Sequence, residues 1–600
     1  MRIIFFLLIF FTRPVKSQVK LEPIIHSSKQ EIAKKDSLNK ASIVEQDDIE
    51  TLGAHQLDEL LRKSFGVAIA STGSITGESS AFIRGAESRH TLILIDGMKF
   101  YDPTSLGRNI NLNTLRILDI ERIELLEGTQ STLYGSDAIG GVINIITKKG
   151  SDKSSALVGG GYYSTLNLNQ SLNFDQNSFH FAASYLESDE LSTARNGAEK
   201  DNSINKTLSI THNFENEELF MKTVFRNSSQ FNNTDTQEFS TGEIKDDFNN
   251  YSKNDQLFLS HSLEVKVMPQ RTVYFDLSFS KHKRVEKFLV ESDYQRSTFD
   301  GDSLIGEIRV KEQFLDGNLI YGISQSNDFV SSKELDRADQ KMSDLFINHY
   351  QKFMGLSFDY GARATHNQDF GTHLVYKAGV EKPFAQNQLF FGVISATGFK
   401  APSISQLYSP DIGGFQIGNE SLAPEKSLSH EFYSKINYGI YEGRVSFFNQ
   451  KISDLVEFQN ASGYVNSKEL EIRGFEFKNH LSWRRSELGF LLNLYDFDKT
   501  GSFDVLRRAE RNYLIFANHR ISDEHEIGFN WNYQSDRADV LNNKQVKLGE
   551  FDTFDLNYKF SRKRVTLFAN IQNLFDRKYE LVKGYSTLGR SVSVRVKWDY

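Results

Sequence analysis

The stretch ERIELLEGTQSTLYGSDAIGGVINIIT, residues 121–147, predicts two apolar strands joined through glycine corners. Gly128 marks a turn after the first strand, Gly135 lies in a tight Tyr-Gly corner, and a glycine pair leads into the apolar run at residues 142–146. Glycine at such corners allows backbone conformations that other residues avoid, or the close approach of another segment. Taken alone, the stretch fits a small α/β core with ordinary turns.

The surrounding sequence behaves as one small unit, which we expect to cover residues 42–150. Three acids followed by spaced leucines in residues 47–61 predict one helix with acidic residues in its first turn, where the helix dipole favours them. AFIRG (residues 81–85) predicts a strand. TLILIDGMKF (residues 91–100) predicts a strand, an Asp-Gly turn and a second strand.

From residue 151 to residue 600 the sequence alternates apolar and polar residues in many short segments. FHFAASY, for example, places Phe179, Phe181 and Tyr185 on one face, as in strands with one apolar side. About 450 residues, at 9 to 11 per tilted strand plus turns, accommodate about 22 strands, and the lumen of such a barrel is wide enough to need a plug. The predicted fold class is an all-β membrane barrel of about 22 antiparallel strands, with a mixed α/β plug domain in its lumen.

Two segments near the C-terminus define this pattern most clearly. Residues 554–560 and 565–571 form alternating runs on either side of the polar turn SRKR, which predicts a hairpin. The last ten residues, SVSVRVKWDY, alternate up to Tyr600 and resemble the terminal strand by which outer-membrane barrels are assembled. The edge strand of a soluble β-sandwich is the alternative, but it would not explain alternation to the final residue.

The composition is compatible with a barrel and excludes several kinds of site. Hydrophobic residues make up 39% of the 600 and mean hydropathy is −0.44, as in many soluble proteins. A barrel has similar averages because only alternate strand residues face lipid. The chain has no cysteine, which excludes disulfides, cysteine-bound metals and thiol nucleophiles. The net charge of −8 argues against a nucleic-acid partner. The 14 histidines form no zinc pair and no phosphate loop is present, so we expect no enzyme.

The N-terminus predicts export. MRIIFFLLIFFTRPVKS (residues 1–17) has a basic residue, an apolar run and a small residue at its end, as in a secretory signal peptide. A buried N-terminal strand is the alternative. The following segment, residues 18–41, is polar with a short extended core, and such a segment is able to add as a strand to the sheet edge of another protein.

Several motifs resemble the TonB-dependent outer-membrane receptors. AFIRG, LILIDG (residues 92–97) and YGSDAIGGVINIIT (residues 134–147) resemble the plug of that family, and the last resembles its cobalamin (vitamin B12) branch. GFKAP, QLY and GNESLAPEKS, within residues 397–427, resemble its barrel. NLFDRKYELVKGYSTLGR (residues 573–590) resembles the C-terminus of the cobalamin receptors. The intervening loops are not matched.

The resemblance implies a domain order and a function. It implies a signal peptide at residues 1–17, a periplasmic leader with a TonB box at residues 18–41, a plug at residues 42–150 and a transmembrane barrel at residues 151–600. It implies a monomer among outer-membrane lipids of a Gram-negative bacterium, which imports cobalamin or a related corrinoid with energy from the proton-motive force, delivered through TonB. A siderophore or other metal-chelate importer is one alternative, and a passive barrel or adhesin is another.

Three sets of residues are carried over from this resemblance. The TonB box is expected at Leu21, Glu22, Pro23, Ile24, Ile25, His26, Ser27 and Ser28, although its last four residues depart from the Val-Thr-Ala-like ending of the family. The plug loops at residues 71–80 and 101–113 are expected to face the ligand through Thr72, Ser74, Thr76, Tyr101, Asp102 and Arg108. No cofactor is required, but calcium in the extracellular loops is expected at Asp189, Glu190, Glu199, Asp201, Asp235, Asp246 and Asp247, for which solvated acidic loops are the alternative.

Charged residues in the plug have two interpretations. Arg84, Glu121, Arg122 and Glu124 lie beside predicted strands, and buried charges must be paired. They hold the plug in the barrel by polar contacts, or they are ordinary surface charges.

Overall fold

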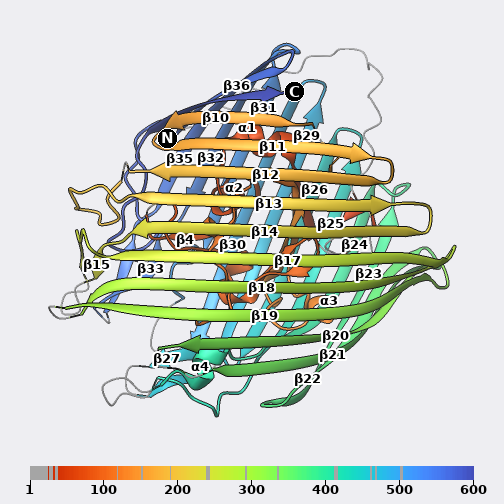
Figure 1. Ribbon diagram of the computed structural model, residues 1–600. Helices are drawn as coiled ribbons and strands as arrows, with labels where there is room; N and C mark the ends of the chain where they lie inside the picture. The colour runs from red at the N-terminus through yellow and green to blue at the C-terminus, as the bar shows by residue number, and fades with distance from the viewer. Residues whose placement is uncertain are drawn as a thin grey trace.

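Twenty-two antiparallel strands close into a barrel, and the plug elements, red to orange in Figure 1, lie inside it. The computed structural model describes residues 24–25, 32–33, 38, 40–73, 75–117, 119–150, 153–189, 191–237, 243–290, 293–333, 335, 337–410, 417–459, 462–466, 469–500, 505–542 and 544–600. Each barrel strand pairs with its neighbours in chain order, and the last strand pairs with the first. The predicted barrel of about 22 strands is confirmed.

The barrel strands differ about threefold in length. The wall is therefore taller on one side and lower where the last strand pairs with the first. They are β10 (Ser155–Gly161), β11 (Ser164–Phe174), β12 (Asn177–Ser188), β13 (Ser203–Glu215), β14 (Leu219–Asn233), β17 (Tyr251–Met268), β18 (Arg271–Val290), β19 (Asp293–Gln313), β20 (Gly317–Ser332), β21 (Ala338–Phe353), β22 (Leu356–Asn367), β23 (Gly371–Phe384), β24 (Leu389–Lys400), β25 (Glu425–Tyr438), β26 (Tyr441–Ser453), β29 (Glu469–Trp483), β30 (Ser486–Thr500), β31 (Arg511–Arg520), β32 (His525–Gln534), β35 (Phe551–Arg562), β36 (Val565–Gln572) and β37 (Ser591–Asp599).

Alternation determines which face each residue occupies. In β37 the residues Val592, Val594 and Val596 are 44–53% exposed, whereas Ser593 and Arg595 are at most 4% exposed and face the plug. The predicted hairpin of β35 and β36 is also confirmed, with register Arg562↔Val565 at its turn. The long loops all lie at one end of the barrel and only short turns join the strands at the other, which in outer-membrane barrels are the extracellular and periplasmic ends.

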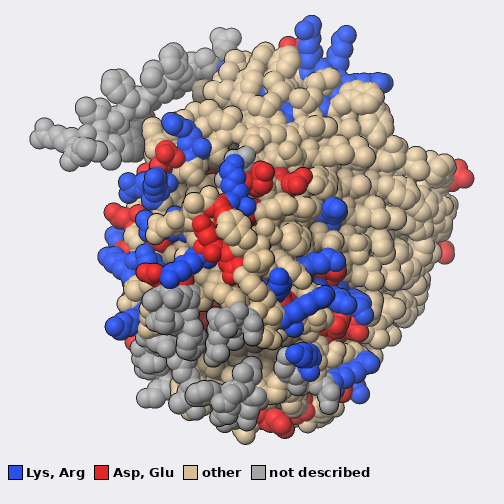
Figure 2. Space-filling view, turned by 60° about the vertical axis from the view of Figure 1, so that its left-hand side comes forward, with Lys and Arg blue, Asp and Glu red and all other residues tan. Residues whose placement is uncertain are grey.

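The long loops carry small elements of their own. The hairpins are β15 (Thr236–Gln237) with β16 (Ile244–Lys245), β27 (Val456–Gln459) with β28 (Gly463–Asn466), and β33 (Arg537–Leu541) with β34 (Lys544–Leu548); α4 (Ile404–Tyr408) lies in the loop after β24. Charged side chains gather at this loop end and leave the barrel wall largely free of charge (Figure 2).

The plug is built on a five-stranded mixed sheet in the order β3-β8-β9-β6-β7, with β6 and β9 parallel. Its elements are β3 (Lys40–Glu45), α1 (Gln46–Leu52), α2 (Leu57–Phe65), β4 (Ala68–Ser71), β5 (Ser79–Phe82), η2 (Ile83–Gly85), η3 (Ser88–His90), β6 (Thr91–Ile95), β7 (Met98–Lys99), η4 (Leu112–Thr114), β8 (Ile120–Glu127), α3 (Ser131–Tyr134) and β9 (Gly141–Thr147). The stretch at residues 121–147 thus supplies two of the three inner strands and the short helix between them. Leucine and isoleucine side chains of these elements form the main apolar core.

Two predictions for the plug are wrong in part. The single helix expected over residues 47–61 is two helices, because Gly53 ends α1 in a left-handed conformation (φ 70°). The strand expected at residues 81–85 ends at Phe82, and Arg84 has a φ of 52°. The turn predicted between β6 and β7 is confirmed, with positive φ at Asp96 and Gly97. None of the helices in the described residues is long and apolar enough to cross a membrane.

Candidate functional site

The plug contacts the barrel wall through buried ion pairs, and Arg84 forms two of them. Its two Nη atoms donate to Glu431 of β25 at 2.8 Å and to Glu476 of β29 at 2.9 Å. All three side chains are at most 7% exposed. Because a buried charge is stable only when it is paired, Arg84 links the folding of this part of the plug to its place in the barrel.

Further pairs surround the plug on several sides. Among the described residues they include Glu50 with Lys597, Lys63 with Asp555, Arg89 with Glu425, Asp96 with Lys222, Arg108 with Asp328, Asp119 with Arg226, and Asp137 with Lys400. His90 is hydrogen-bonded to Glu425. A different arrangement holds for the charges predicted in β8, since Arg122 pairs with Glu121 at 2.9 Å and with Glu124 at 3.0 Å within the plug. Arg84 therefore supports the first interpretation, in which plug charges make polar contacts with the barrel. Its partners lie hundreds of residues away in the sequence and were not predictable from it.

The expected ligand-facing plug residues are largely turned towards the wall or their own loop. The Thr76 carbonyl accepts from Asn232 of β14 at 2.8 Å. The Tyr101 hydroxyl donates to Asp328 of β20 at 2.8 Å, and Arg108 lies 3.1 Å from the same carboxylate.

The other members of this set lie within the loops. Asp102 accepts from the Thr104 amide at 2.8 Å, Thr72 closes the β4–β5 hairpin by accepting from the Glu78 amide at 2.9 Å, and Ser74 lies outside the described residues. Their contact with a ligand stays a prediction.

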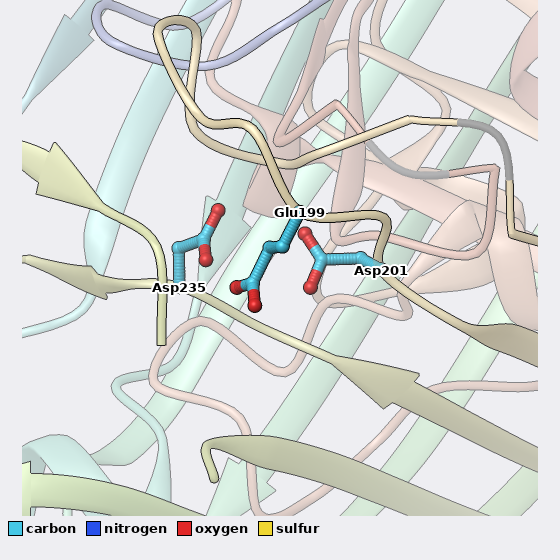
Figure 3. A group of neighbouring side chains, drawn as sticks. All are labelled: Glu199, Asp201 and Asp235. Atoms are coloured by element: carbon cyan, nitrogen blue, oxygen red, sulfur yellow. The ribbon is translucent and has the colours of Figure 1, made fainter. Parts of the chain in front are cut away.

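An acidic cluster joins two long loops, and Figure 3 shows Glu199 between Asp201 and Asp235. Glu199 and Asp201 precede β13, whereas Asp235 follows β14, and their carboxylate oxygens lie within 4.8 Å of one another. Backbone amides hold the group in place, because Thr193 donates to Asp201 at 2.6 Å and Ala194 donates to Asp235 at 2.5 Å. The sequence placed these acids in two separate loops, and the structure brings them together.

Two more predicted acids surround this cluster. Asp246 accepts from the Ala198 amide at 2.7 Å, and the Asp247 amide donates to Glu199 at 2.9 Å. Asp189 is exposed at the end of β12 and is not one of the three clustered acids, and Glu190 lies outside the described residues.

The local environment favours protonation of the cluster. Burial, with a hydrogen bond to Asp235, raises the pKa of Glu199 to about 7. Burial also raises the pKa of Asp201 to about 6, with the charges of Asp235 and Asp246 adding to the effect. Acids that are crowded in this way hold protons more readily than free acids, and a divalent cation is able to take the place of those protons.

The loop between β36 and β37, residues 573–590, covers part of the plug. Ser586 donates from its amide to the Thr193 carbonyl at 2.9 Å and from its hydroxyl to the Ala194 carbonyl at 3.0 Å. Under this loop lies a cavity of about 110 Å³, lined among others by Arg62, Asn113 and Tyr579. The sequence identified this segment as a family motif, but nothing in it indicated that the loop would lie against the acidic cluster.

The leader is described only in part. Ile24 and Ile25 form β1, which pairs antiparallel with β2 (Ile32–Ala33). The remaining residues of the predicted TonB box, Leu21, Glu22, Pro23, His26, Ser27 and Ser28, lie outside the described residues. Leu38 packs against side chains of the barrel wall. The sequence did not indicate it as a functional residue.

This architecture matches two family models and known proteins. The family model described as "TonB dependent receptor-like, beta-barrel" matches residues 146–574, and "TonB-dependent Receptor Plug Domain" matches residues 33–142. A curated relative, the vitamin B12 transporter BtuB of Vibrio cholerae serotype O1, is 25% identical over 604 residues, covering 94% of this chain and 93% of the relative.

Solved structures share the fold. The siderophore receptor PirA of Acinetobacter baumannii has a TM-score of 0.80 at 16% identity, covering 94% of this chain and 99% of that one. The ferric enterobactin receptor PfeA of Pseudomonas aeruginosa has a TM-score of 0.77 at 16% identity, covering 93% and 99%. With a 22-stranded barrel, a plug in its lumen and a barrel match over more than half of its length, this chain belongs to the TonB-dependent receptors of the outer membrane.

Proposed function

We propose that this receptor imports cobalamin or a related corrinoid across the outer membrane, driven by the inner-membrane proton-motive force through TonB. The observation that carries the proposal is the likeness to a vitamin B12 transporter over 94% of the chain. The two solved siderophore receptors are each 16% identical, a level at which similarity speaks only for the fold.

The interior of the barrel supports active transport over diffusion. The plug lies inside the barrel and is bonded to the wall on several sides, so passage of a corrinoid requires the plug to rearrange. The plug–wall interface contains hydrogen bonds and ion pairs beside its apolar contacts, and water is able to replace those hydrogen bonds when the plug moves. The outer membrane has no nucleotide supply, and energy therefore comes from a partner that reaches the leader.

The acidic cluster fits calcium. Calcium takes six to eight oxygen ligands from carboxylates, carbonyls and water. Glu199, Asp201 and Asp235 offer carboxylates within 4.8 Å of one another, and Asp246 and Asp247 are hydrogen-bonded around them. A bound cation would neutralise the loops and order them for substrate. The expected role of these residues is to hold the two loops together at the mouth of the barrel.

Binding of cyanocobalamin to the purified, detergent-solubilised receptor tests both parts of the proposal. We expect tight binding that is strengthened by calcium and weakened by a chelator. Asp235→Asn should abolish the calcium effect, whereas Asp189→Asn, which changes an exposed acid outside the cluster, should preserve it.

The other outcomes separate the alternatives. Tight binding that does not depend on calcium would support the importer and contradict the calcium proposal. Binding of a ferric chelate without binding of a corrinoid would identify a metal-chelate importer. Uptake that survives deletion of residues 19–30 would exclude coupling through TonB and indicate a passive barrel.

A further inference from the structure

One residue fixes the junction between leader and plug to the barrel wall. Leu38 lies two residues before β3 and is 1% exposed. It packs among Tyr350 of β21, Ile394 of β24 and Tyr433 of β25. Gly379 of β23 completes the socket, since a Cβ at that position would lie 3.1 Å from Leu38 Cδ2. The socket therefore uses four strands of the wall near their periplasmic turns.

Arg444 of β26 holds the backbone of the same residue. Its Nη1 and Nη2 donate to the Leu38 carbonyl at 3.3 and 3.2 Å. Its guanidinium carbon lies 3.8 Å from the centre of the Tyr433 ring. Both the side chain and the carbonyl of Leu38 are thus bound by the wall.

Arg444 also connects this contact to the ion pairs of the plug. Its Nη2 donates to Glu431 Oε1 at 2.9 Å, and the other oxygen of Glu431 accepts from Arg84 at 2.8 Å. Arg84 in turn pairs with Glu476. The contacts form a continuous path from Leu38 through Arg444 and Glu431 to Arg84, and every polar side chain on it is at most 11% exposed.

Along the described part of the chain, this contact comes after the β1–β2 pair and before the plug sheet in the line of a pull. β3 is an edge strand that pairs only with β8 in the plug sheet, and its first register pair is Lys40↔Glu127. A force on the leader reaches Leu38 before it reaches Lys40. After Leu38 has left its socket, the pairs between β3 and β8 are free to open in order from Lys40.

We propose that Leu38 and Arg444 form an anchor that must release before a pull by TonB on the leader reaches the buried ion pairs of the plug. They are positioning residues, which act on the plug through Glu431. The anchor rests on the coupling to TonB in the proposed function, but it is independent of which ligand the receptor carries.

Single-molecule pulling on the N-terminal end of the reconstituted, full-length receptor tests the anchor without any ligand. We expect a rupture of the anchor, called here the first rupture, after the β1–β2 pair opens and before the ruptures of the plug. Leu38→Ala should raise the zero-force rate of this first rupture by at least about tenfold, because truncation of a buried leucine removes most of its contacts. Arg444→Gln should raise the same rate, and the double variant should show less than the product of the two effects.

Two controls separate the anchor from general loosening of the plug. Leu38→Met, which conserves volume, should keep the first rupture. Leu60→Ala, in the plug core and 0% exposed in the native chain, should weaken later ruptures and leave the first unchanged. Equal first-rupture rates in the native chain and Leu38→Ala would overturn the proposal, and so would an equal acceleration by Leu60→Ala.

A covalent lock gives a second measurement. Because the chain has no cysteine, Leu38→Cys with Gly379→Cys introduces the only disulfide. The oxidised protein should bind ligand as the reduced one does but should not transport it, and reductant should restore transport. Transport by the oxidised form would contradict the anchor, whereas failure to bind cobalamin in either form would contradict only the proposed ligand.

Discussion

Arg84 shows how a single residue makes the docking of the plug a condition of its stability. Arg84→Met would leave Glu431 and Glu476 without this partner inside the barrel, a loss of about 3–5 kcal/mol for a broken buried pair. We expect faster amide hydrogen exchange throughout the plug and little change in the barrel strands. Arg485→Met, which breaks an exposed pair with Asp523, should change exchange by less than about 1 kcal/mol. Unchanged plug protection in Arg84→Met would contradict this role.

The acidic cluster makes loop stability depend on pH. Burial raises the pKa of Glu199 from 4.5 to about 7 and that of Asp201 from 3.8 to about 6. The folded loops therefore bind more protons than the unfolded loops, and their calcium-free stability should fall as pH rises from about 4 to about 7. Calcium competes with these protons, so its apparent affinity should rise over the same range.

Calcium titrations at several pH values, followed by hydrogen exchange in residues 191–202, measure this linkage. Glu199→Gln should flatten the upper part of the pH dependence, and Asp189→Asn should leave it intact. Calcium affinity that does not change between about pH 5 and pH 7 would show that protons and metal do not share the cluster.

At the residue scale the sequence predicted the types of side chain better than their partners. Arg84 was identifiable because it stands next to a predicted strand, whereas the acids of the cluster were expected from the resemblance to the family, in a set that also held Asp189 and Glu190. Glu431, Glu476 and the wall contacts of Tyr101 were not, since pairing over 200 to 400 residues depends on the closed barrel. Leu38 carried no local signal because a lone leucine in a polar leader has no period.

At the scale of elements, alternation predicted the strands, and turn geometry determined where the plug departed from expectation. β37 and the β35–β36 hairpin followed directly from the period of two. The helix expected over residues 47–61 divides at Gly53, whose φ of 70° no helical period would reveal. Gly53 also lies against Asn570 of β36, which is 1% exposed and hydrogen-bonded to Asn557 at 2.8 Å.

Gly53→Ala should therefore destabilise the plug more than the same change at Gly97. Both glycines have positive φ, and a methyl group in that conformation costs about 1–2 kcal/mol. A Cβ at Gly97 meets nothing within 4 Å, whereas one at Gly53 would press on Asn570 and its hydrogen bonds. Proteolysis of the plug in the two variants measures the difference. Equal susceptibility would mean that Asn570 moves aside freely and that the close approach contributes nothing.

At the scale of the whole molecule, polar contacts connect the mouth of the barrel, the plug and the leader. The barrel provides the wall for all three, and its closure brings β10 beside β37 and the 573–590 loop beside the loop after β12. The 573–590 loop packs on the plug at one end, and Leu38 of the leader packs on the wall at the other.

Calcium should accordingly order more than the loops that supply its ligands. The Thr193 and Ala194 amides donate to Asp201 and Asp235, while their carbonyls accept from Ser586, so one short segment faces the acids on one side and the 573–590 loop on the other. We expect calcium to slow hydrogen exchange in residues 191–202 and, through this segment, in residues 573–590. Ser586→Ala removes one of the two bonds and should reduce protection of the second loop only. If calcium protects residues 191–202 alone in the native chain, the two loops move independently. The 573–590 loop would then open over the plug whether or not calcium is bound.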